Sequence, residues 1–456
     1  MKPTLSFSVA LLAFASFAFS PASSVRAQNA DKESATIADK ISRTRISGVD
    51  VIAYKTGVKD VVTFRGSLPA GDSFAPETNV AIPTLVGGML DKGTTRQDKF
   101  AIAQQLESVG ARLSFEVHEM MLTFSGKCLR KDLPLVISLL AEQLRSPAFS
   151  SDEFDKLKKQ LAGNLRRMME STDYRANEAF VRAVYSVDHP NHAPSTEEFL
   201  KDVEAATLND LKSFYSSFYG PAQMTLVAVG DLDAATLQAE VQKAFQGWSG
   251  GKAIPKFAKS TSTDVKKEQS VYLADKTSVS IVMGQASGLR YTDNDALALR
   301  VANAIFGRGF TGRLMSTVRD TEGLTYGIGS SLGNDAFTDG DFRIFAQFNP
   351  ELLEQGLTST RRELTLWYTK GVTAQELERS KNDLIGSYKV GLATTDGLAE
   401  SILLTVHRGY GVDWLDQYPQ RIQALTLDQV NGAITRHLNP AKMITVKAGT
   451  LPDAKP

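Results

Sequence analysis

The sequence predicts an α+β protein with two homologous domains, because blocks of residues in its second half repeat blocks in its first half. One block recurs at a constant offset: Thr207-Leu208, Pro221-Ala222-Gln223-Met224 and Gly230 return as Thr426-Leu427, Pro440-Ala441-Lys442-Met443 and Gly449. An earlier block recurs at a slightly larger offset that is again constant: Phe154, Leu161 and Gly163 return as Leu377, Leu384 and Gly386. A small change of offset between two blocks is what a change in loop length leaves, so the chain is most simply one fold that was duplicated and then diverged.

The first half alternates strand-like and helical runs in blocks, as an α+β domain does. Strand-like runs lie at 49–54, 60–64, 112–117, 121–126 and 224–229. Helical runs lie at 84–90, 98–109, 133–144, 151–169, 208–218 and 233–248. Local signals support three of these helices, because Gly110 can end the second, Pro134 sits in the first turn of the third, and Ser151 can cap the fourth.

The second half shows the same mixture of elements. Strand candidates lie at 270–273, 279–283, 328–332 and 342–348. Helix candidates lie at 295–306, 350–370, 373–390, 394–408 and 427–438. Each half is therefore predicted to be a sheet rich in antiparallel strands, packed with long helices.

Length and composition place the domain boundaries. A chain of 456 residues is long enough for two hydrophobic cores. Residues 249–255 read Ser-Gly-Gly-Lys-Ala-Ile-Pro, which is the composition of a linker. We therefore assign residues 28–248 to an N-terminal domain, 249–260 to a linker and 261–456 to a C-terminal domain.

Residues 1–27 have the pattern of a signal peptide. Lys2 supplies a positive start, residues 5–19 are apolar, and Val25-Arg26-Ala27 offers a cleavage site before Gln28. The alternative, an uncleaved anchor, is disfavoured because the apolar core is about fifteen residues, short of the ~20 that span a bilayer. We expect an exported protein, with the periplasm as its destination, and no stable membrane insertion of the mature chain.

Charge and cysteine content exclude several classes of protein. Lys plus Arg and Asp plus Glu both number 51, so the net charge indicates neither nucleic acid nor an anionic membrane as a partner. The single cysteine, Cys128, excludes an internal disulfide and a cysteine-rich metal site. It lies in the alternating run 122–128 and is predicted to be a buried strand residue rather than a nucleophile.

A series of short motifs carries a family resemblance along the whole mature chain. In the first half these are Met89-Leu90, Lys92-Gly93-Thr94, Leu106-Glu107-Ser108-Val109-Gly110, Ser146-Pro147-Ala148-Phe149 and Asp188-His189-Pro190. In the second half they are Arg313-Leu314, Arg319 and Gly323-Leu324-Thr325-Tyr326. In order and spacing they resemble the M16 metallopeptidases, the pitrilysin and mitochondrial processing peptidase group. The resemblance implies an M16/LuxS-metallohydrolase-like fold whose two domains form half of a clamshell.

The catalytic signature of that family is erased here. The family carries His-x-x-Glu-His on a helix and a further glutamate about seventy-five residues later, so that one helical face binds zinc and a glutamate serves as base. Aligned on Lys92-Gly93-Thr94, the signature positions hold Thr84, Gly87 and Gly88, and the distal glutamate position falls at or beside Asn164. We expect no zinc in this chain and no peptide hydrolysis by the chain alone.

Other candidate sites are weaker. His189 and His192 lie three residues apart beside Asp188, but Pro190 between them favours a turn over a ligand-bearing helix. His118 has no second ligand at helical spacing. The glycine-rich run 306–312 follows a helix and lacks the Gly-Lys-Ser/Thr ending of a phosphate loop, so a loop beside a substrate channel is the preferred interpretation.

One functional pair is retained. Arg319 and Tyr326 match, by the resemblance, an arginine and a tyrosine that reach the zinc site of a partner half and bind the substrate carbonyl. Both side chains are donors suited to a peptide carbonyl and to its developing oxyanion. From spacing alone, a surface arginine and a packed tyrosine would be the simpler interpretation.

An erased signature together with a retained pair resembles the non-zinc subunit of heterodimeric M16 peptidases. The resemblance implies a His-x-x-Glu-His homologue as partner, zinc in that partner, unfolded peptide as substrate, and Arg319 and Tyr326 acting in trans. Two alternatives stay open. The chain could be a catalytically silent scaffold subunit, or an autonomous exported peptide-binding protein.

Overall fold

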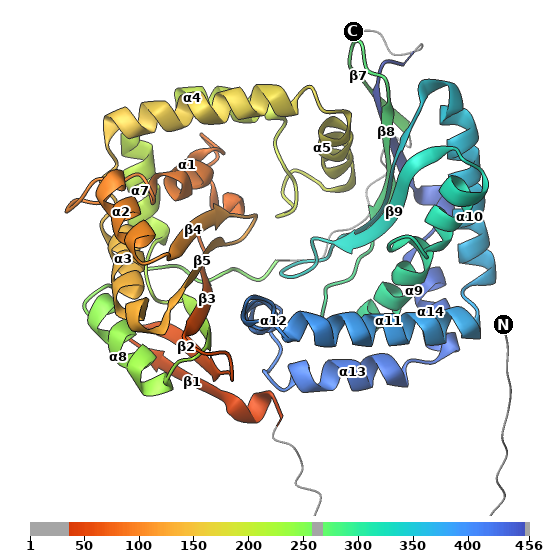
Figure 1. Cartoon of the computed structure of the whole chain (residues 1–456). Coiled ribbons are helices and arrows are strands. Elements are labelled where there is room, and N and C mark those ends of the chain that lie inside the picture. Colours follow the sequence, from red (N-terminus) through yellow and green to blue (C-terminus); the bar gives the residue numbers. More distant parts are fainter. Residues whose placement is uncertain (1–35, 258–267, 452–456) are drawn as a thin grey trace, which may run out of the picture. The chain divides into compact units, whose positions relative to one another are not determined.

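The computed structural model describes residues 36–257 and 268–451 (Figure 1). The predicted signal peptide and the last residues of the predicted linker lie outside the described residues. The described chain contains two mixed β-sheets, each packed with helices, so the predicted α+β class is confirmed. No helix in the described ranges combines the length and the apolar character needed to cross a membrane.

The first sheet has the strand order β1-β2-β6-β3-β5-β4. Its strands are β1 (Ile41–Ile46), β2 (Val49–Lys55), β3 (Val61–Leu68), β4 (Arg112–Val117), β5 (Leu122–Leu129) and β6 (Thr225–Gly230). Only β2 and β6 pair in parallel among its neighbours, so the sheet is rich in antiparallel pairs.

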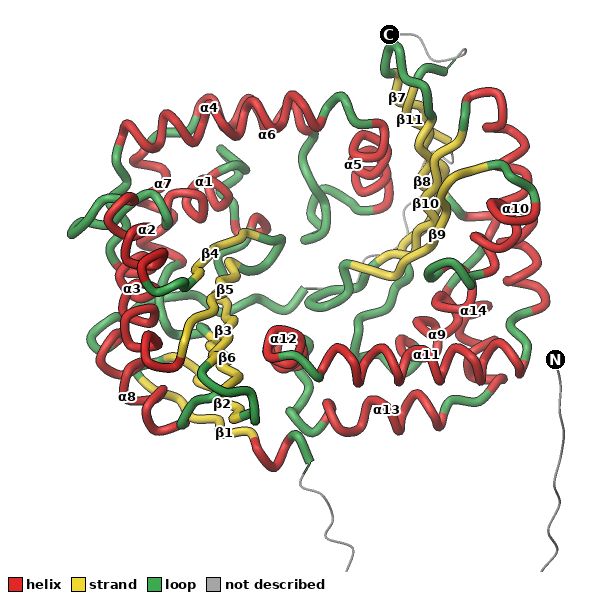
Figure 2. The backbone as a smooth tube through the Cα atoms, in the orientation of Figure 1, coloured by secondary structure: helices red, strands yellow, loops and turns green. Residues whose placement is uncertain are grey.

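The second sheet has the strand order β7-β11-β8-β10-β9 (Figure 2). Its strands are β7 (Glu268–Tyr272), β8 (Val279–Ala286), β9 (Thr325–Gly333), β10 (Asp341–Phe348) and β11 (Ile444–Gly449). Here β11 and β7 form the parallel pair. The strand order therefore repeats that of the first sheet, with β1 as an addition at the edge of the first.

The helices fall into two similar series. Those of the first half are α1 (Ile82–Met89), α2 (Lys99–Ser108), α3 (Leu133–Arg145), α4 (Ser151–Met168), α5 (Thr172–Val184), α6 (Thr196–Ala205), α7 (Leu208–Phe218) and α8 (Ala234–Phe245). Those of the second half are α9 (Ala296–Gly307), α10 (Leu353–Lys370), α11 (Ala374–Leu392), α12 (Thr395–His407), α13 (Trp414–Ala424) and α14 (Leu427–His437).

The two offsets inferred from the sequence are those of the structural repeat. Helices α4 and α11 begin at Ser151 and Ala374, which are separated by the same offset as Phe154 and Leu377. Helices α7 and α14 begin at Leu208 and Leu427, the matched leucines of the other block. Because the elements of the two halves correspond at both offsets, the prediction of two homologous domains is confirmed.

Each sheet buries one face under helices of its own half. The first core gathers side chains from the first sheet and from α1, α3, α7 and α8, including Phe64, Leu85 and Phe245. The second gathers side chains from the second sheet and from α9, α10 and α14. At its centre the Trp367 ring stacks on Phe306, with 4.4 Å between centroids.

The opposite face of each sheet is covered by a helix from the other half (Figure 1). Helix α5 packs Phe180 and its neighbours against Val282 of β8 and Val446 of β11. Helix α12 packs Ile402 and its neighbours against Ile52 of β2 and Val227 of β6. Because helices of the first half cover one face of β6 and α12 covers the other, every residue of this strand is buried.

The two exchanged helices are anchored by equivalent hydrogen bonds. The hydroxyl of Thr172, the first residue of α5, lies 2.8 Å from the Ser280 hydroxyl on β8. The hydroxyl of Thr395, the first residue of α12, lies 2.9 Å from the Thr63 hydroxyl on β3. All four side chains are buried, so these bonds satisfy polar groups inside apolar interfaces.

Candidate functional site

The erased signature lies on α1, whose buried face packs into the first core. Thr84 donates its hydroxyl hydrogen bond to Asp72, over 2.8 Å between Oγ1 and Oδ1. Asn164, on α4, accepts a hydrogen bond from the guanidinium of Arg167. Neither side chain at these positions is a customary zinc ligand.

Neighbouring side chains leave little room for a side chain at the two signature glycines, Gly87 and Gly88. A Cβ atom added at Gly87 would lie 2.3 Å from Cγ2 of Val117 on β4. One added at Gly88 would lie 3.0 Å from Cδ2 of Leu157 on α4. Neither glycine has the left-handed backbone that would by itself require glycine. Val117 leaves no room for a side chain at Gly87, while at Gly88 the end of the Leu157 side chain would have to shift slightly. The residues present do not fit a zinc ion or a catalytic glutamate at this place.

No other metal centre emerges from the described ranges. Among them, no group of three or more His, Cys, Asp and Glu side chains is placed to hold a metal ion. His189 is buried in a turn and contacts Asp339 of the second half at 3.3 Å, while His192 bonds the Tyr185 carbonyl at 3.0 Å. Cys128 is buried on β5, and burial raises the pKa of its thiol to about 12, which keeps it protonated.

Asp72 gives the Thr84 contact a pH dependence. Burial raises the pKa of this carboxyl from 3.8 to about 6, so the folded state binds a proton more tightly than the unfolded state. The free energy of unfolding should therefore fall as the pH rises from about 4 to about 6. Asp72→Asn cannot ionise and keeps an acceptor for Thr84, so we expect its chemical-denaturation curves to lose this part of the pH dependence. Identical pH profiles for the variant and the native chain would contradict this account.

Arg319 is positioned by a π-helical turn, η4 (Met315–Thr321), which is tied down on both sides. Before the turn, Arg313 makes two 2.6 Å bonds to Glu376 of α11. After it, Glu322 binds Ser359 and Arg362 of α10, each at 2.5 Å. The turn then reverses at Gly323, whose φ of 65° is in the left-handed region. These anchors hold η4 between two long helices.

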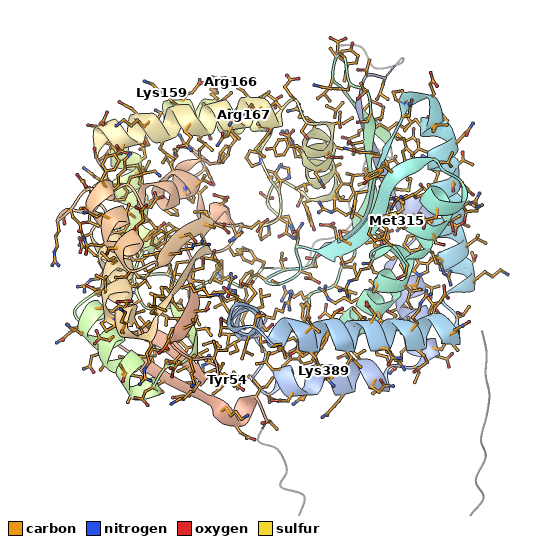
Figure 3. All side chains as sticks on the ribbon, in the orientation of Figure 1. Tyr54, Lys159, Arg166, Arg167, Met315 and Lys389 are labelled. Carbon is orange, nitrogen blue, oxygen red and sulfur yellow. The ribbon has the colours of Figure 1, made fainter. Side chains whose placement is uncertain are left out.

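Arg319 and Tyr326 come together in space. Tyr326 lies on β9, and its ring centroid is 5.1 Å from the Arg319 Cζ. Phe310, from the glycine-rich loop, lies 5.2 Å from the same Cζ. Both rings are largely exposed, at 89% for Tyr326 and 70% for Phe310. Met315, labelled in Figure 3, belongs to the same turn, and its Sδ is 4.0 Å from the Arg319 Nη1.

The donors of this pair are available to a ligand. The carboxylate nearest to Arg319 in the described chain is that of its neighbour Asp320, at 3.8 Å from Nε, which is a weak and exposed contact. The Tyr326 hydroxyl makes no hydrogen bond to another described residue. Two aromatic rings orient the guanidinium without consuming its hydrogen bonds, as a cation–π contact does. A peptide carbonyl is a suitable acceptor for both groups.

Phe310 is a residue of this cluster that sequence reasoning missed. The sequence did contain a hint, because Phe310 is a large apolar residue between Gly309 and Gly312, in a stretch predicted to be a loop. Each sheet also ends in an edge strand: β4, which packs beside the helix α1 that carries the erased signature, and β9, which carries Tyr326.

The chain belongs to the M16 peptidase family. A family model described as insulinase (peptidase family M16) matches residues 51–192, and one described as peptidase M16 inactive domain matches residues 205–384. These matches, the two-domain fold and the position of the erased signature agree, so the family resemblance predicted from the sequence motifs is confirmed.

Relatives and solved structures share most of the chain. The "Non-peptidase homolog YmxG" of Helicobacter pylori is 24% identical over 82% of this chain and 85% of its own. The "Uncharacterized zinc protease SCO5738" of Streptomyces coelicolor is 25% identical over 69% of each chain. The crystal structure of a peptidase M16 inactive domain from Pseudomonas fluorescens superposes with a TM-score of 0.83 at 25% identity, covering 91% of this chain and 99% of that one.

Proposed function

We propose that this chain is the non-zinc subunit of an exported heterodimeric M16 peptidase. One observation carries the proposal, the contrast between two sites. Val117 and Leu157 crowd the signature positions, whereas Arg319 and Tyr326 lie side by side with hydrogen-bond donors that a ligand can use. A chain that had lost all catalytic use would have no reason to keep an exposed tyrosine against an arginine whose only ion pair in the described chain is the weak contact with Asp320.

Arg319 and Tyr326 act on the substrate rather than on a metal. The guanidinium donates to the carbonyl oxygen of the scissile peptide bond, and the phenol donates a second hydrogen bond to the same oxygen or to the adjacent main chain. Both bonds strengthen as negative charge develops on that oxygen, which lowers the barrier selectively. The partner's zinc would supply the activated water that attacks the carbonyl carbon.

The comparisons support one part of this proposal, namely that the chain is not a peptidase by itself. The Helicobacter pylori relative is named a non-peptidase homologue, and the Pseudomonas fluorescens structure is described as an M16 inactive domain. Other relatives are named zinc proteases, so the family supplies candidates for the zinc-bearing partner. Unfolded peptide is the substrate that an open β-edge can bind, because an extended segment adds to β4 or β9 through main-chain hydrogen bonds.

Peptide hydrolysis should require both subunits. The mature chain purified alone is expected to leave an unstructured fluorogenic peptide intact, and its complex with a His-x-x-Glu-His homologue from the same genome is expected to cleave it. Chelation should abolish that cleavage, and added zinc should restore it. The homologue alone serves as the control.

Two results would overturn this proposal. Cleavage by the isolated chain would place a catalytic site elsewhere in it. Full activity of the homologue alone, unchanged by this chain, would favour the second candidate, a scaffold or peptide-binding subunit. The open sheet edges are the observation that favours that candidate, since they need no catalytic partner to bind an extended segment.

A further inference from the structure

A cavity of about 490 Å³ lies where β3, β4 and β5 of the first half meet α12 and the β9–β10 turn of the second. This volume is within the range of pockets that bind small molecules or a few residues of a peptide. Much of its wall is apolar, with Met121 and Phe124 on one side and Phe337 and Leu403 on the other. It contains neither Arg319 nor Tyr326.

Three arginines line this cavity, and two of them are neutralised. Arg65 pairs with Glu400 of α12 at 2.6 Å, and Arg300 of α9 pairs with Asp335 in the β9–β10 turn. The third, Arg408, follows the last residue of α12. In the described part of the chain it forms no ion pair and no side-chain hydrogen bond, and its Nε, like those of Arg65 and Arg300, is buried without a partner.

Arg408 is held in place by an aromatic ring. Its Cζ lies 3.6 Å from the centroid of Tyr291, and the Cζ of Arg300 lies 4.1 Å from the same centroid. Burial lowers the pKa of Arg408, and the positive charge of Arg300 lowers it further, while Tyr291 and the carboxylate of Asp335 act in the opposite direction. Two guanidinium groups thus share one ring, and the carboxylate of Asp335 is ion-paired with Arg300, which leaves the positive charge of Arg408 without an ion-pair partner in the described chain.

The neighbouring groups do not cancel that charge. His407 is bonded to Ser67 at 2.6 Å, and burial lowers the pKa of its imidazole to about 4, so the ring is neutral near pH 7. Glu116 and Glu119 also line the cavity, but both are exposed to water, which screens them. A half-buried guanidinium without a carboxylate is costly, and an anionic ligand removes that cost.

We propose that this cavity binds the C-terminal carboxylate of a peptide, with Arg408 as the anchoring group. A guanidinium presents two parallel N–H donors to a carboxylate, and one arginine without an ion-pair partner matches one negative charge. The apolar walls receive the side chains next to the terminus. The inference takes a peptide as ligand from the proposed function, but the site lies within one chain and needs no zinc-bearing partner.

Binding is tested on the isolated full-length mature chain with a labelled, unstructured peptide whose only carboxylate is its C-terminus. The free acid is expected to bind about tenfold more tightly than the C-terminal amide by fluorescence anisotropy. In Arg408→Met this difference between acid and amide should vanish. Arg408→Lys keeps the charge but loses the fork of donors, so it should retain part of the difference.

The matched control is Arg166→Met, because Arg166 forms an exposed pair with Glu204 on the outer helices and does not line the cavity. It should keep the full preference for the acid. Thermal unfolding of each variant separates loss of the site from loss of the fold. Equal binding of acid and amide by the native chain would overturn the proposal, as would tighter binding of inorganic phosphate that the peptide cannot displace. Hydrolysis by the two-subunit complex is measured separately, so failure here leaves the role of Arg319 untouched.

Discussion

Arg319→Ala is expected to lower kcat of the two-subunit peptidase by about 100-fold, since removal of one oxyanion donor typically costs that much. Substrate affinity should change far less, because the proposed bonds strengthen mainly as charge develops on the carbonyl oxygen. Tyr326→Phe removes only one neutral donor and should lower kcat by about tenfold. Steady-state kinetics on the reconstituted complex measure both effects.

Two matched controls are available on the surface of the second half. Arg361→Ala breaks an exposed pair with Glu268, and Tyr272→Phe alters a partly exposed tyrosine on β7. Both should leave kcat within about twofold of the native complex. If Arg319→Ala and Tyr326→Phe behave like these controls while the complex stays assembled, the pair has no role in trans.

Gly87→Ala is expected to destabilise the chain, although alanine is normally the better helix former. The added methyl group would lie 2.3 Å from Val117 Cγ2, and overpacking of this kind costs about 1–3 kcal/mol of unfolding free energy. Gly163→Ala on α4 is the matched control, because its Cβ would have no heavy atom within 4 Å. That change should stabilise the chain by about 0.5–1 kcal/mol. Chemical denaturation of both variants measures the difference.

The predicted loss of stability in Gly87→Ala, against the gain in Gly163→Ala, bears on whether the zinc signature could be restored by substitution. A histidine or glutamate at Gly87 or Gly88 needs more room than a methyl group, and Val117 and Leu157 occupy that room. A variant with the full His-x-x-Glu-His motif should therefore lose stability before it gains a metal. A neutral or stabilising Gly87→Ala would show that the pocket still has space, and the loss of the motif would then be a matter of residue identity alone.

Much of the fold could be predicted from residues in the printed sequence. The repeated Thr-Leu and Pro-Ala-x-Met blocks lie at the starts of α7 and α14 and just before β6 and β11, so their offsets measured the true repeat. Helix α5 was missed, as were α6 and α13. For α6 a signal was present, the capping box between Ser195 and Glu198. Pro419 inside α13 argues against a helix in local terms, and only packing against α11 and α12 overrides it.

The candidate site was predicted in part. Arg319 and Tyr326 could be nominated because a motif of consecutive residues carries them, and the structure places them side by side. Phe310 belongs to the same cluster, but its contact with Arg319 depends on the conformation of the glycine-rich loop, which no sequence motif predicts. The cavity beside Arg408 has no local motif at all, because its walls come from residues far apart in the chain.

The sequence by itself determined the family, the duplication and the loss of the zinc signature, since each is a statement about residue identity at a fixed spacing. Only the tertiary structure decided that α5 packs against the second sheet and α12 against the first, that Val117 and Leu157 crowd the signature positions, and that Arg408 forms no ion pair within the described chain. The physical reason is that burial and charge compensation depend on contacts between residues distant in sequence. Those contacts arise only when the apolar faces of both halves pack together.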